Sequence, residues 1–152
     1  MIRVLFLCHG NICRSPMAKY IMNKKISEAG LSAAIQADSA ALHTDEIGNG
    51  VYPPVKKLLE RAGINCDDHR ARLASRNDYD LYDYIICMDD ANVRDARRLF
   101  AGDPLCKIHK LREYTDGENA PDVDDPWYTR DFEKAYAQIE AGCKSIMKEE
   151  TK

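Results

Sequence analysis

The fold of this chain is decided by residues 2–16, which read IRVLFLCHGNICRSP. Ile2 to Leu7 is nearly all apolar and β-prone, which predicts a strand buried on both faces of a sheet. Ser15 and Pro16 predict the start of a helix, with Ser15 as its N-cap and Pro16 at the first helical position. Cys8 to Arg14 is therefore expected to form a loop between the end of a buried strand and the start of a helix.

Strands and helices alternate along the rest of the chain. Further strands are expected at 34–40, 84–88 and 105–108, and helices at 16–29, 53–62, 91–100 and 132–147. The segment 109–130 is rich in Asp, Gly and Pro and is expected to be a long loop. This order predicts an α/β fold in a single three-layer domain over residues 1–152, with a central four-stranded parallel sheet flanked by helices on both faces. Ligands of such folds bind at the carboxyl ends of the strands, where residues 8–14 fall.

Composition and charge narrow the class of protein. The 152 residues carry a formal net charge of −3, which argues against a nucleic acid or an anionic membrane as partner. The apolar run at 2–7 is too short for a signal peptide, and no stretch approaches the ~20 apolar residues that span a bilayer. The six cysteines include no Cys-x-x-Cys pair. We expect a cytoplasmic monomer that needs no metal and no cofactor.

A cysteine followed six positions later by an arginine occurs three times, at Cys8/Arg14, Cys66/Arg72 and Cys106/Arg112. In the second pair two aspartates lie inside the would-be loop, and they would repel a phosphate. The third pair lacks a glycine and begins in a predicted strand. We interpret both as structural, because neither loop could turn its backbone N–H groups toward an anion.

The loop from Cys8 to Arg14 has the features of an anion site. Gly10 and Asn11 are the residue types that most readily adopt positive φ, which lets backbone N–H groups surround an anion. The dipole of the following helix adds positive potential at the same point. Arg14 adds a planar guanidinium that can bind two phosphate oxygens.

The same field is expected to favour the thiolate form of Cys8. The predicted chemistry is displacement of a leaving oxygen by sulfur, giving a cysteinyl-phosphate that water later hydrolyses. The Ser15 hydroxyl would donate to the sulfur and stabilise it as a thiolate. The alternative interpretation is a buried structural cysteine beside a helix cap.

Expulsion of the leaving oxygen needs a proton donor, and Asp125 is the best candidate for this general acid. It lies in the acidic segment with Asp122 and Asp124, and Pro126 restricts its backbone. Trp127 and Tyr128 follow and would line a slot for a substrate that carries a ring. The alternative is a solvated acidic turn at residues 124–125.

At these residues the chain resembles the low-molecular-weight protein tyrosine phosphatase family, and the resemblance covers essentially its whole length. The strongest matches are residues 4–18, VLFLCHGNICRSPMA, and residues 125–128, DPWY. Shorter landmarks are Ser39-Ala40-Ala41, His69-Arg70-Ala71-Arg72 and residues 83–89. The resemblance implies hydrolysis of phosphotyrosine in proteins or of small aryl phosphates.

The resemblance also implies roles for residues. Cys8 is the nucleophile, Arg14 binds phosphate, Asp125 is the general acid, and Ser15 assists the thiolate. The phosphate-binding loop comprises His9, Gly10, Asn11, Ile12, Cys13 and Arg14. Asn11, Ser39 and His69 form the hydrogen bonds that support this loop. Trp127 and Tyr128 are walls of the substrate cleft, and Cys13 is a redox partner that would form a reversible disulfide with Cys8.

The chain departs from the family pattern in one segment. Many members carry an aromatic cleft residue shortly after the Ser39 landmark, whereas residues 43–47 read HTDEI here. Asp45 and Glu46 are therefore expected at the rim of the cleft, where they would disfavour acidic peptides. His9 is expected to contact the leaving group or to cap the rim.

Three alternatives stay open. A thioredoxin-coupled arsenate reductase of the same fold would need two further cysteines close together, and none follows Cys87 before Cys106. The protein arginine phosphatase branch carries a small polar residue where this chain has Ile12. A phosphopeptide-binding module without turnover would not need Cys8, Arg14 and Asp125 together.

Overall fold

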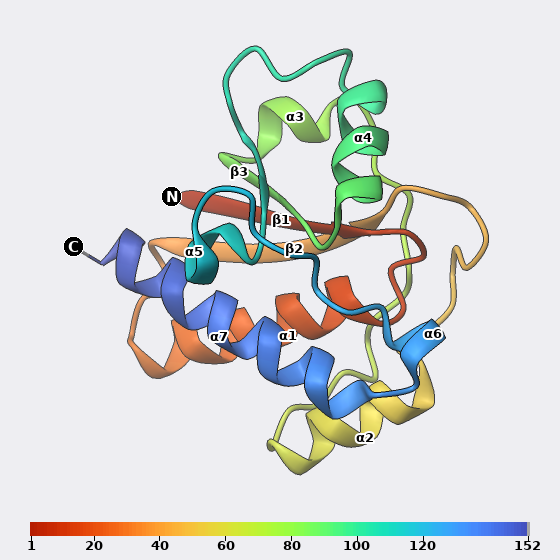
Figure 1. The fold of residues 1–152 in the computed structure, drawn as a ribbon. Helices are drawn as coiled ribbons and strands as arrows, with labels where there is room; N and C mark the ends of the chain where they lie inside the picture. The colour runs from red at the N-terminus through yellow and green to blue at the C-terminus, as the bar shows by residue number, and fades with distance from the viewer. Residues whose placement is uncertain (152) are drawn as a thin grey trace.

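A computed structural model describes residues 1–151 and arranges them around one sheet (Figure 1). The sheet has four parallel strands in the order β2-β1-β3-β4. Their bounds are β1 (Ile2–Cys8), β2 (Ile35–Ala41), β3 (Tyr84–Cys87) and β4 (Ile108–Lys110). The register places Phe6 of β1 between Ser39 of β2 and Ile86 of β3.

Helices cover both faces of this sheet. In Figure 1, α1, α2 and α7 lie on one face, and α3 and α4 lie on the other. The bounds are α1 (Arg14–Glu28), α2 (Pro53–Arg61), α3 (Asp78–Leu81), α4 (Asp90–Leu99), α5 (Glu113–Asp116), α6 (Pro126–Thr129) and α7 (Phe132–Glu150). The predicted three-layer α/β fold with a central four-stranded parallel sheet is confirmed. Within residues 1–151, no helix is long and apolar enough to cross a membrane.

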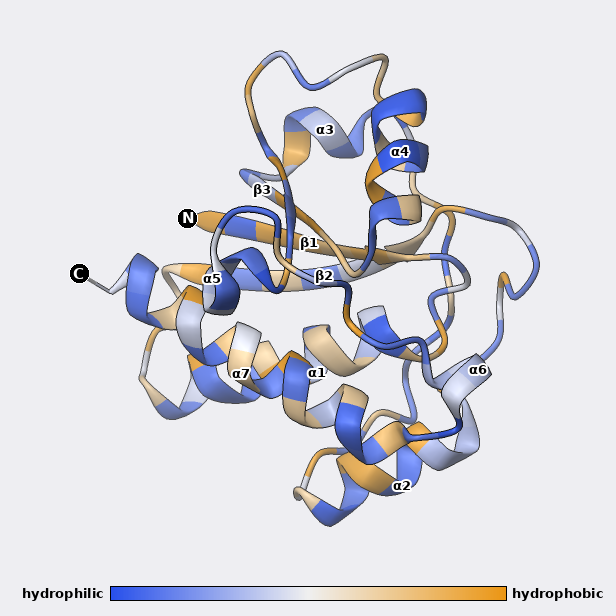
Figure 2. Ribbon diagram, in the orientation of Figure 1, coloured by the Kyte–Doolittle hydropathy of each residue, from blue (hydrophilic) through white to orange (hydrophobic). Residues whose placement is uncertain are grey.

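Strand β1 is the centre of the core and is buried on both faces, as predicted. Val4 and Phe6 pack into the apolar cluster formed with α1 and α7, and Leu5 and Leu7 pack into the cluster formed with α4. All four side chains have no exposed surface. Figure 2 shows hydrophobic residues along β1 between the two helical layers. Successive strand residues point to opposite faces, so a continuous apolar run suits a strand covered on both sides.

The connections on either side of β1 decide where a ligand can bind. Through α1 the chain passes to β2 on one side of β1, whereas β3 lies on the other side. A crevice forms at the carboxyl ends of strands where the order reverses in this way. The loop after β1 starts at this crevice, in agreement with the prediction.

Two boundary predictions were wrong. Strand β4 lies at 108–110 rather than 105–108, because the Asp103 carboxylate accepts hydrogen bonds from the N–H groups of Lys107 and Ile108 and holds the preceding residues in a turn. Cys106 in that turn has φ 52°, which a strand does not allow. The segment 109–130 also contains the short helices α5 and α6, so it is not a continuous loop.

The start of α1 also differs from the prediction. Its N-cap is Cys13, and no side chain caps it, so Ser15 and Pro16 are the second and third helical residues. The Ser15 hydroxyl lies instead within hydrogen-bond distance of the Cys8 sulfur and of Asn11. Pro16 is tolerated there because N–H groups in the first turn have no partner within the helix.

Candidate active site

The loop after β1 turns at one left-handed residue. Asn11 has φ 61°, whereas Gly10 is not left-handed, so the expectation of positive φ is correct for Asn11 and wrong for Gly10. A Cβ atom at position 10 would lie 3.2 Å from Cγ of Glu46. The glycine is thus suited to the close approach of the rim rather than to a strained backbone angle.

Asn11 is fully buried, and its side-chain amide and its backbone carbonyl all form hydrogen bonds. Its Nδ2 donates to Ser15 Oγ at 2.8 Å and to Ser39 Oγ at 2.9 Å. Its Oδ1 accepts from the N–H of Arg72 at 3.2 Å, and its carbonyl oxygen accepts from Nε2 of His69 at 2.7 Å. The predicted grouping of Asn11, Ser39 and His69 is present in the structure, and Arg72 was missed.

His69 is held in its neutral form. Burial lowers its pKa below 6.5, and the cation of Lys19 acts in the same direction. The carbonyl of Asn11 can only accept a hydrogen bond, so Nε2 of the neutral ring carries the proton. The ring thereby ties the loop to the segment before β3 without adding a positive charge.

Cys8 lies at the bottom of the site, 4% exposed. Its sulfur is 2.9 Å from Ser15 Oγ, and Cys8 is itself the last residue of β1. The N-terminus of α1 and the Arg14 guanidinium both place positive potential near it. This surrounding suits a sulfur that carries negative charge.

Arg14 is 3% exposed and is held by three oxygen atoms. Nη1 donates to the carbonyl of Val123 at 3.0 Å, and Nη2 donates to Asp89 Oδ2 at 2.9 Å and Asp125 Oδ2 at 3.4 Å. Burial alone would lower the pKa of Arg14, but negative charge at Cys8, Asp125 and Asp89 outweighs it and raises the pKa. The guanidinium is therefore charged and held in one orientation.

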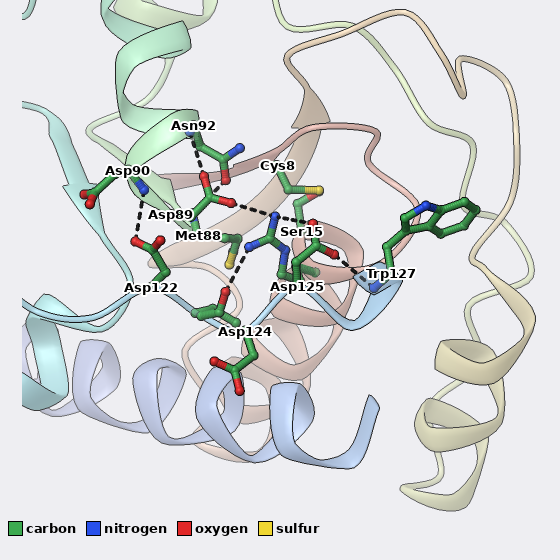
Figure 3. Close-up of polar contacts among 12 residues, drawn as sticks. Cys8, Ser15, Met88, Asp89, Asp90, Asn92, Asp122, Asp124, Asp125 and Trp127 are labelled. Carbon is green, nitrogen blue, oxygen red and sulfur yellow. Dashed lines mark hydrogen bonds and ion pairs between the residues drawn. The ribbon is translucent and has the colours of Figure 1, made fainter. Parts of the chain in front are cut away.

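Asp125 faces the site from the start of α6. Its Oδ1 accepts from the N–H of Trp127 at 3.0 Å, which makes it the N-cap of this helix. Nη2 of Arg14 is within hydrogen-bond distance of both Asp89 and Asp125. Figure 3 shows these two carboxylates with Cys8 and Ser15 nearby. The structure thus brings Asp125 beside the loop, while Asp124 pairs with Lys134 on α7.

The segment that carries Asp125 is anchored to the sheet. Lys110, at the end of β4, is buried, and its Nζ lies 2.8 Å from Asp122 Oδ1 and 3.0 Å from Asp90 Oδ1. Its Nζ also donates to the carbonyl of Ala120 at 2.7 Å. The N–H of Val123 donates to the carbonyl of Met88 at 2.8 Å. These bonds place the Val123 carbonyl against Arg14.

A pocket of about 380 Å³ opens above Cys8. All residues from Cys8 to Arg14 except the buried Asn11 line its floor. Its walls include Asp45, Glu46, Asp89, Ala91, Asn92, Asp95, Asp125, Trp127 and Tyr128. All the predicted cleft residues line it. Asp89 and Asp95 were missed, although Asp89 lies two residues after the carboxyl end of β3, where the sheet topology places ligands.

Cys13 lines the same pocket as a free thiol, as does Cys8. Burial raises the pKa of Cys13 to about 12, and negative charge at Cys8 and Asp125 acts in the same direction. Cys13 is therefore protonated at neutral pH. The other four cysteines are also free thiols. Cys66 and Cys106, which have the same spacing to an arginine as Cys8, do not line this pocket.

This arrangement is that of an α/β phosphatase that uses a cysteine in its phosphate loop. Comparison with known proteins supports this class throughout the chain. The family model described as low molecular weight phosphotyrosine protein phosphatase matches residues 3–152. The chain is 40% identical over 147 residues to the low molecular weight protein-tyrosine-phosphatase YfkJ of Bacillus subtilis, covering 97% of this chain and 94% of YfkJ. The human low molecular weight phosphotyrosine protein phosphatase is 36% identical over 148 residues, covering 95% of this chain and 92% of the human protein.

Solved structures agree with these relatives. The crystal structure of YfkJ superposes with a TM-score of 0.93 at 39% identity, covering 98% of this chain and 94% of YfkJ. The crystal structure of DARP, a Drosophila arginine phosphatase, superposes with a TM-score of 0.90 at 30% identity, covering 99% of each chain. The chain belongs to the low molecular weight phosphotyrosine protein phosphatase family, whose named members are enzymes, so the predicted family and function are confirmed.

Proposed function

We propose that this chain hydrolyses phosphotyrosine in proteins through a cysteinyl-phosphate intermediate on Cys8, with Asp125 as the general acid. The observation that carries the proposal is the convergence of Cys8, Arg14 and Asp125 on one pocket. The nucleophile, the phosphate-binding cation and the proton donor then lie around the position of one phosphate group.

In the first step, the thiolate of Cys8 forms a bond to phosphorus while the bond from phosphorus to the tyrosine oxygen breaks. The proton of Asp125 goes to the leaving oxygen. Arg14 and the backbone N–H groups of the loop hold the three non-bridging oxygens. Because Arg14 is already buried and oriented, little ordering of this side chain is needed when phosphate binds.

In the second step, water attacks phosphorus and the bond to sulfur breaks. The Asp125 carboxylate accepts the proton of the water, and inorganic phosphate leaves. The sulfur departs as a thiolate, which the Ser15 hydroxyl at 2.9 Å would stabilise by donating a hydrogen bond. The full cycle needs only water besides the substrate.

The depth of the pocket supports an aryl substrate. Cys8 is 4% exposed at the bottom, whereas Trp127 and Tyr128 are 47% and 81% exposed at the mouth. A phosphate on a long, flat side chain can reach the sulfur and still contact these rings. Tyr52 supports the Trp127 ring at a centroid distance of 5.2 Å.

Phosphoarginine is the second candidate substrate, because the DARP structure is so similar to this chain. Ile12 is 8% exposed and lines the pocket. Its apolar side chain favours an aryl group over a guanidinium there. An arsenate reductase and a binding module without turnover would each predict no hydrolysis of phosphotyrosine peptides.

The test is turnover on matched peptides carrying phosphotyrosine, phosphoserine or phosphoarginine. We expect turnover on phosphotyrosine, and Cys8→Ser should abolish it while inorganic phosphate still binds. Cys106→Ser is the matched control, because Cys106 has the same spacing to an arginine and lies outside the pocket. Preferential turnover of phosphoarginine, or turnover by Cys8→Ser, would overturn the proposal.

We further propose that the protein acts as a monomer in the cytoplasm. Cys8, Arg14 and Asp125 of a single chain supply the nucleophile, the cation and the proton donor, so the proposed reaction requires no residue of a second copy. Six free thiols in 152 residues support a reducing compartment. Sedimentation of the purified protein and fractionation of cells test the two statements separately.

A further inference from the structure

Two histidine rings stack at the rim of the pocket. The centroids of His9 and His43 are 4.1 Å apart, and the ring planes differ by 20°. His9 lines the pocket, and His43 packs against it from the loop after β2. The N–H of His43 also donates to the carbonyl of His9 at 3.0 Å, so the backbones of the two loops are joined at the same place.

A carboxylate anchors each ring. His9 Nε2 lies 2.7 Å from Asp45 Oδ2, and His43 Nε2 lies 2.8 Å from Asp95 Oδ2. Asp95 is on α4, which lies on the face of the sheet opposite α1. The two stacked rings therefore connect the phosphate loop, the loop after β2 and α4. Each imidazole has one nitrogen engaged and one face covered by the other ring, which restricts its rotation.

We propose that His43 is a positioning residue that holds the His9 ring as a wall for the aromatic ring of the substrate. This inference rests on the proposed function, because it concerns how the same pocket selects an aryl phosphate. His9 follows the nucleophile directly, so a ring attached to the phosphate must pass close to it. The His9 side chain is 55% exposed, and without His43 only its hydrogen bond to the exposed Asp45 would restrict its rotamer.

The energetic reason is pre-organisation. A side chain that must be immobilised by the ligand reduces affinity, whereas one that its neighbours already hold does not. The Trp127 ring also has an aromatic neighbour, Tyr52, whose plane is tilted by 57° to it. The pocket therefore has two flat side chains, His9 and Trp127, that each contact a second ring. They come from segments far apart in the chain.

The test compares His43→Ala with His43→Phe, which keeps a flat ring but cannot bond to Asp95. Removal of one aromatic contact corresponds to about a three- to tenfold loss, so we expect kcat/KM for a phosphotyrosine peptide to fall by that factor in His43→Ala. The inhibition constant of inorganic phosphate should stay unchanged, because phosphate has no ring to contact His9. His43→Phe should recover most of the loss. His109→Ala, outside the pocket, is the control for removing a histidine.

An unchanged kcat/KM in His43→Ala would overturn the inference, as would an equal loss of phosphate binding or a failure of His43→Phe to recover activity. A thermal melt of each variant shows whether a loss of kcat/KM is caused by unfolding. For a variant that folds, the inhibition constant of phosphate shows whether the loss is specific to the aromatic ring of the substrate. Failure of the proposed function would be recognised separately, because Cys8→Ser would then keep its turnover.

Discussion

The Nη2 atom of Arg14 lies 2.9 Å from Oδ2 of Asp89, a residue 75 positions later in the chain. Asp89 lies two residues after the end of β3 and caps α4, where its Oδ1 accepts from the N–H of Asn92 at 2.7 Å. One carboxylate therefore orients the phosphate-binding cation and starts a helix. The two roles can be separated by substitution, because asparagine also caps helices well.

We predict that Asp89→Asn lowers kcat/KM by about tenfold, since a charged hydrogen bond contributes ~1.5–3 kcal/mol and an unfixed guanidinium must be ordered by the substrate. Thermal stability should change little, because the cap is kept. Asp80→Asn on α3 is the control, since Asp80 is exposed and does not line the pocket. Unchanged kinetics would show that Asp89 does not position Arg14.

Asp125→Asn should slow poor leaving groups far more than good ones. A general acid contributes about 10²- to 10⁴-fold, and that contribution falls when the leaving oxygen needs no proton. Asp124→Asn is the matched control, because the neighbouring Asp124 pairs with Lys134 instead of facing Arg14. The measurement is a series of aryl phosphates with graded leaving groups. Equal slowing across the series would remove Asp125 from the role of acid.

Asn11→Ala should destabilise the protein by about 2–4 kcal/mol, because alanine resists the left-handed backbone and Ser15, Ser39 and Arg72 lose their partner. Asn11→Gly accepts φ 61° and should cost only the lost hydrogen bonds. Denaturant unfolding separates the two contributions. Both variants should lose activity, since misplacing the loop by about 1 Å can cost up to 100-fold. Equal stabilities of the two variants would argue against backbone strain at this position.

The protein should become less stable as the pH falls below about 6.5, because of His69. Its pKa is lower in the folded state than the usual 6.5, so the unfolded chain binds the proton first. The stability that neutral His69 contributes is complete above pH 6.5 and is lost as the pH falls through the folded pKa. Denaturant unfolding between about pH 8 and pH 5 measures this loss.

Two variants make the assignment to His69 specific. His69→Gln should remove this part of the pH dependence, since glutamine still donates to the carbonyl of Asn11 without titrating. Lys19→Gln should move the loss to higher pH, because Lys19 contributes to the low pKa. A pH dependence that is the same in all three proteins would assign it to other groups.

Neutralising the acidic rim should change which peptides are preferred. His9 donates to Asp45 and lowers its pKa, so this carboxylate is charged at neutral pH. In Asp45→Asn combined with Glu46→Gln, kcat/KM for peptides with acidic residues beside phosphotyrosine should rise about two- to fivefold relative to basic ones, an effect that salt should reduce. Glu140→Gln on α7 is the control, and an unchanged preference would remove the rim from substrate selection.

The sequence predicted the elements that depend on local patterns. The apolar run before Cys8, the alternation of strands and helices, and the motif at 125–128 indicated the fold and the residues of the site. The wrong predictions also came from local patterns. Ser15 and Pro16 have the chemistry of a helix start, yet the Ser15 hydroxyl lies beside the Cys8 sulfur and Asn11, and the helix begins at Arg14, two residues before the predicted Pro16.

By itself, the sequence determined that one short loop carries Cys8 and Arg14 between a buried strand and a helix, because strand patterning and turn chemistry act between neighbours. Only the tertiary structure decided what holds that loop. Asp89 and Val123 reach Arg14 from 75 and 109 positions away, and His43 stacks on His9 from the loop after β2. These contacts depend on the order β2-β1-β3-β4, which brings the carboxyl ends of different strands to one place and which no local pattern specifies.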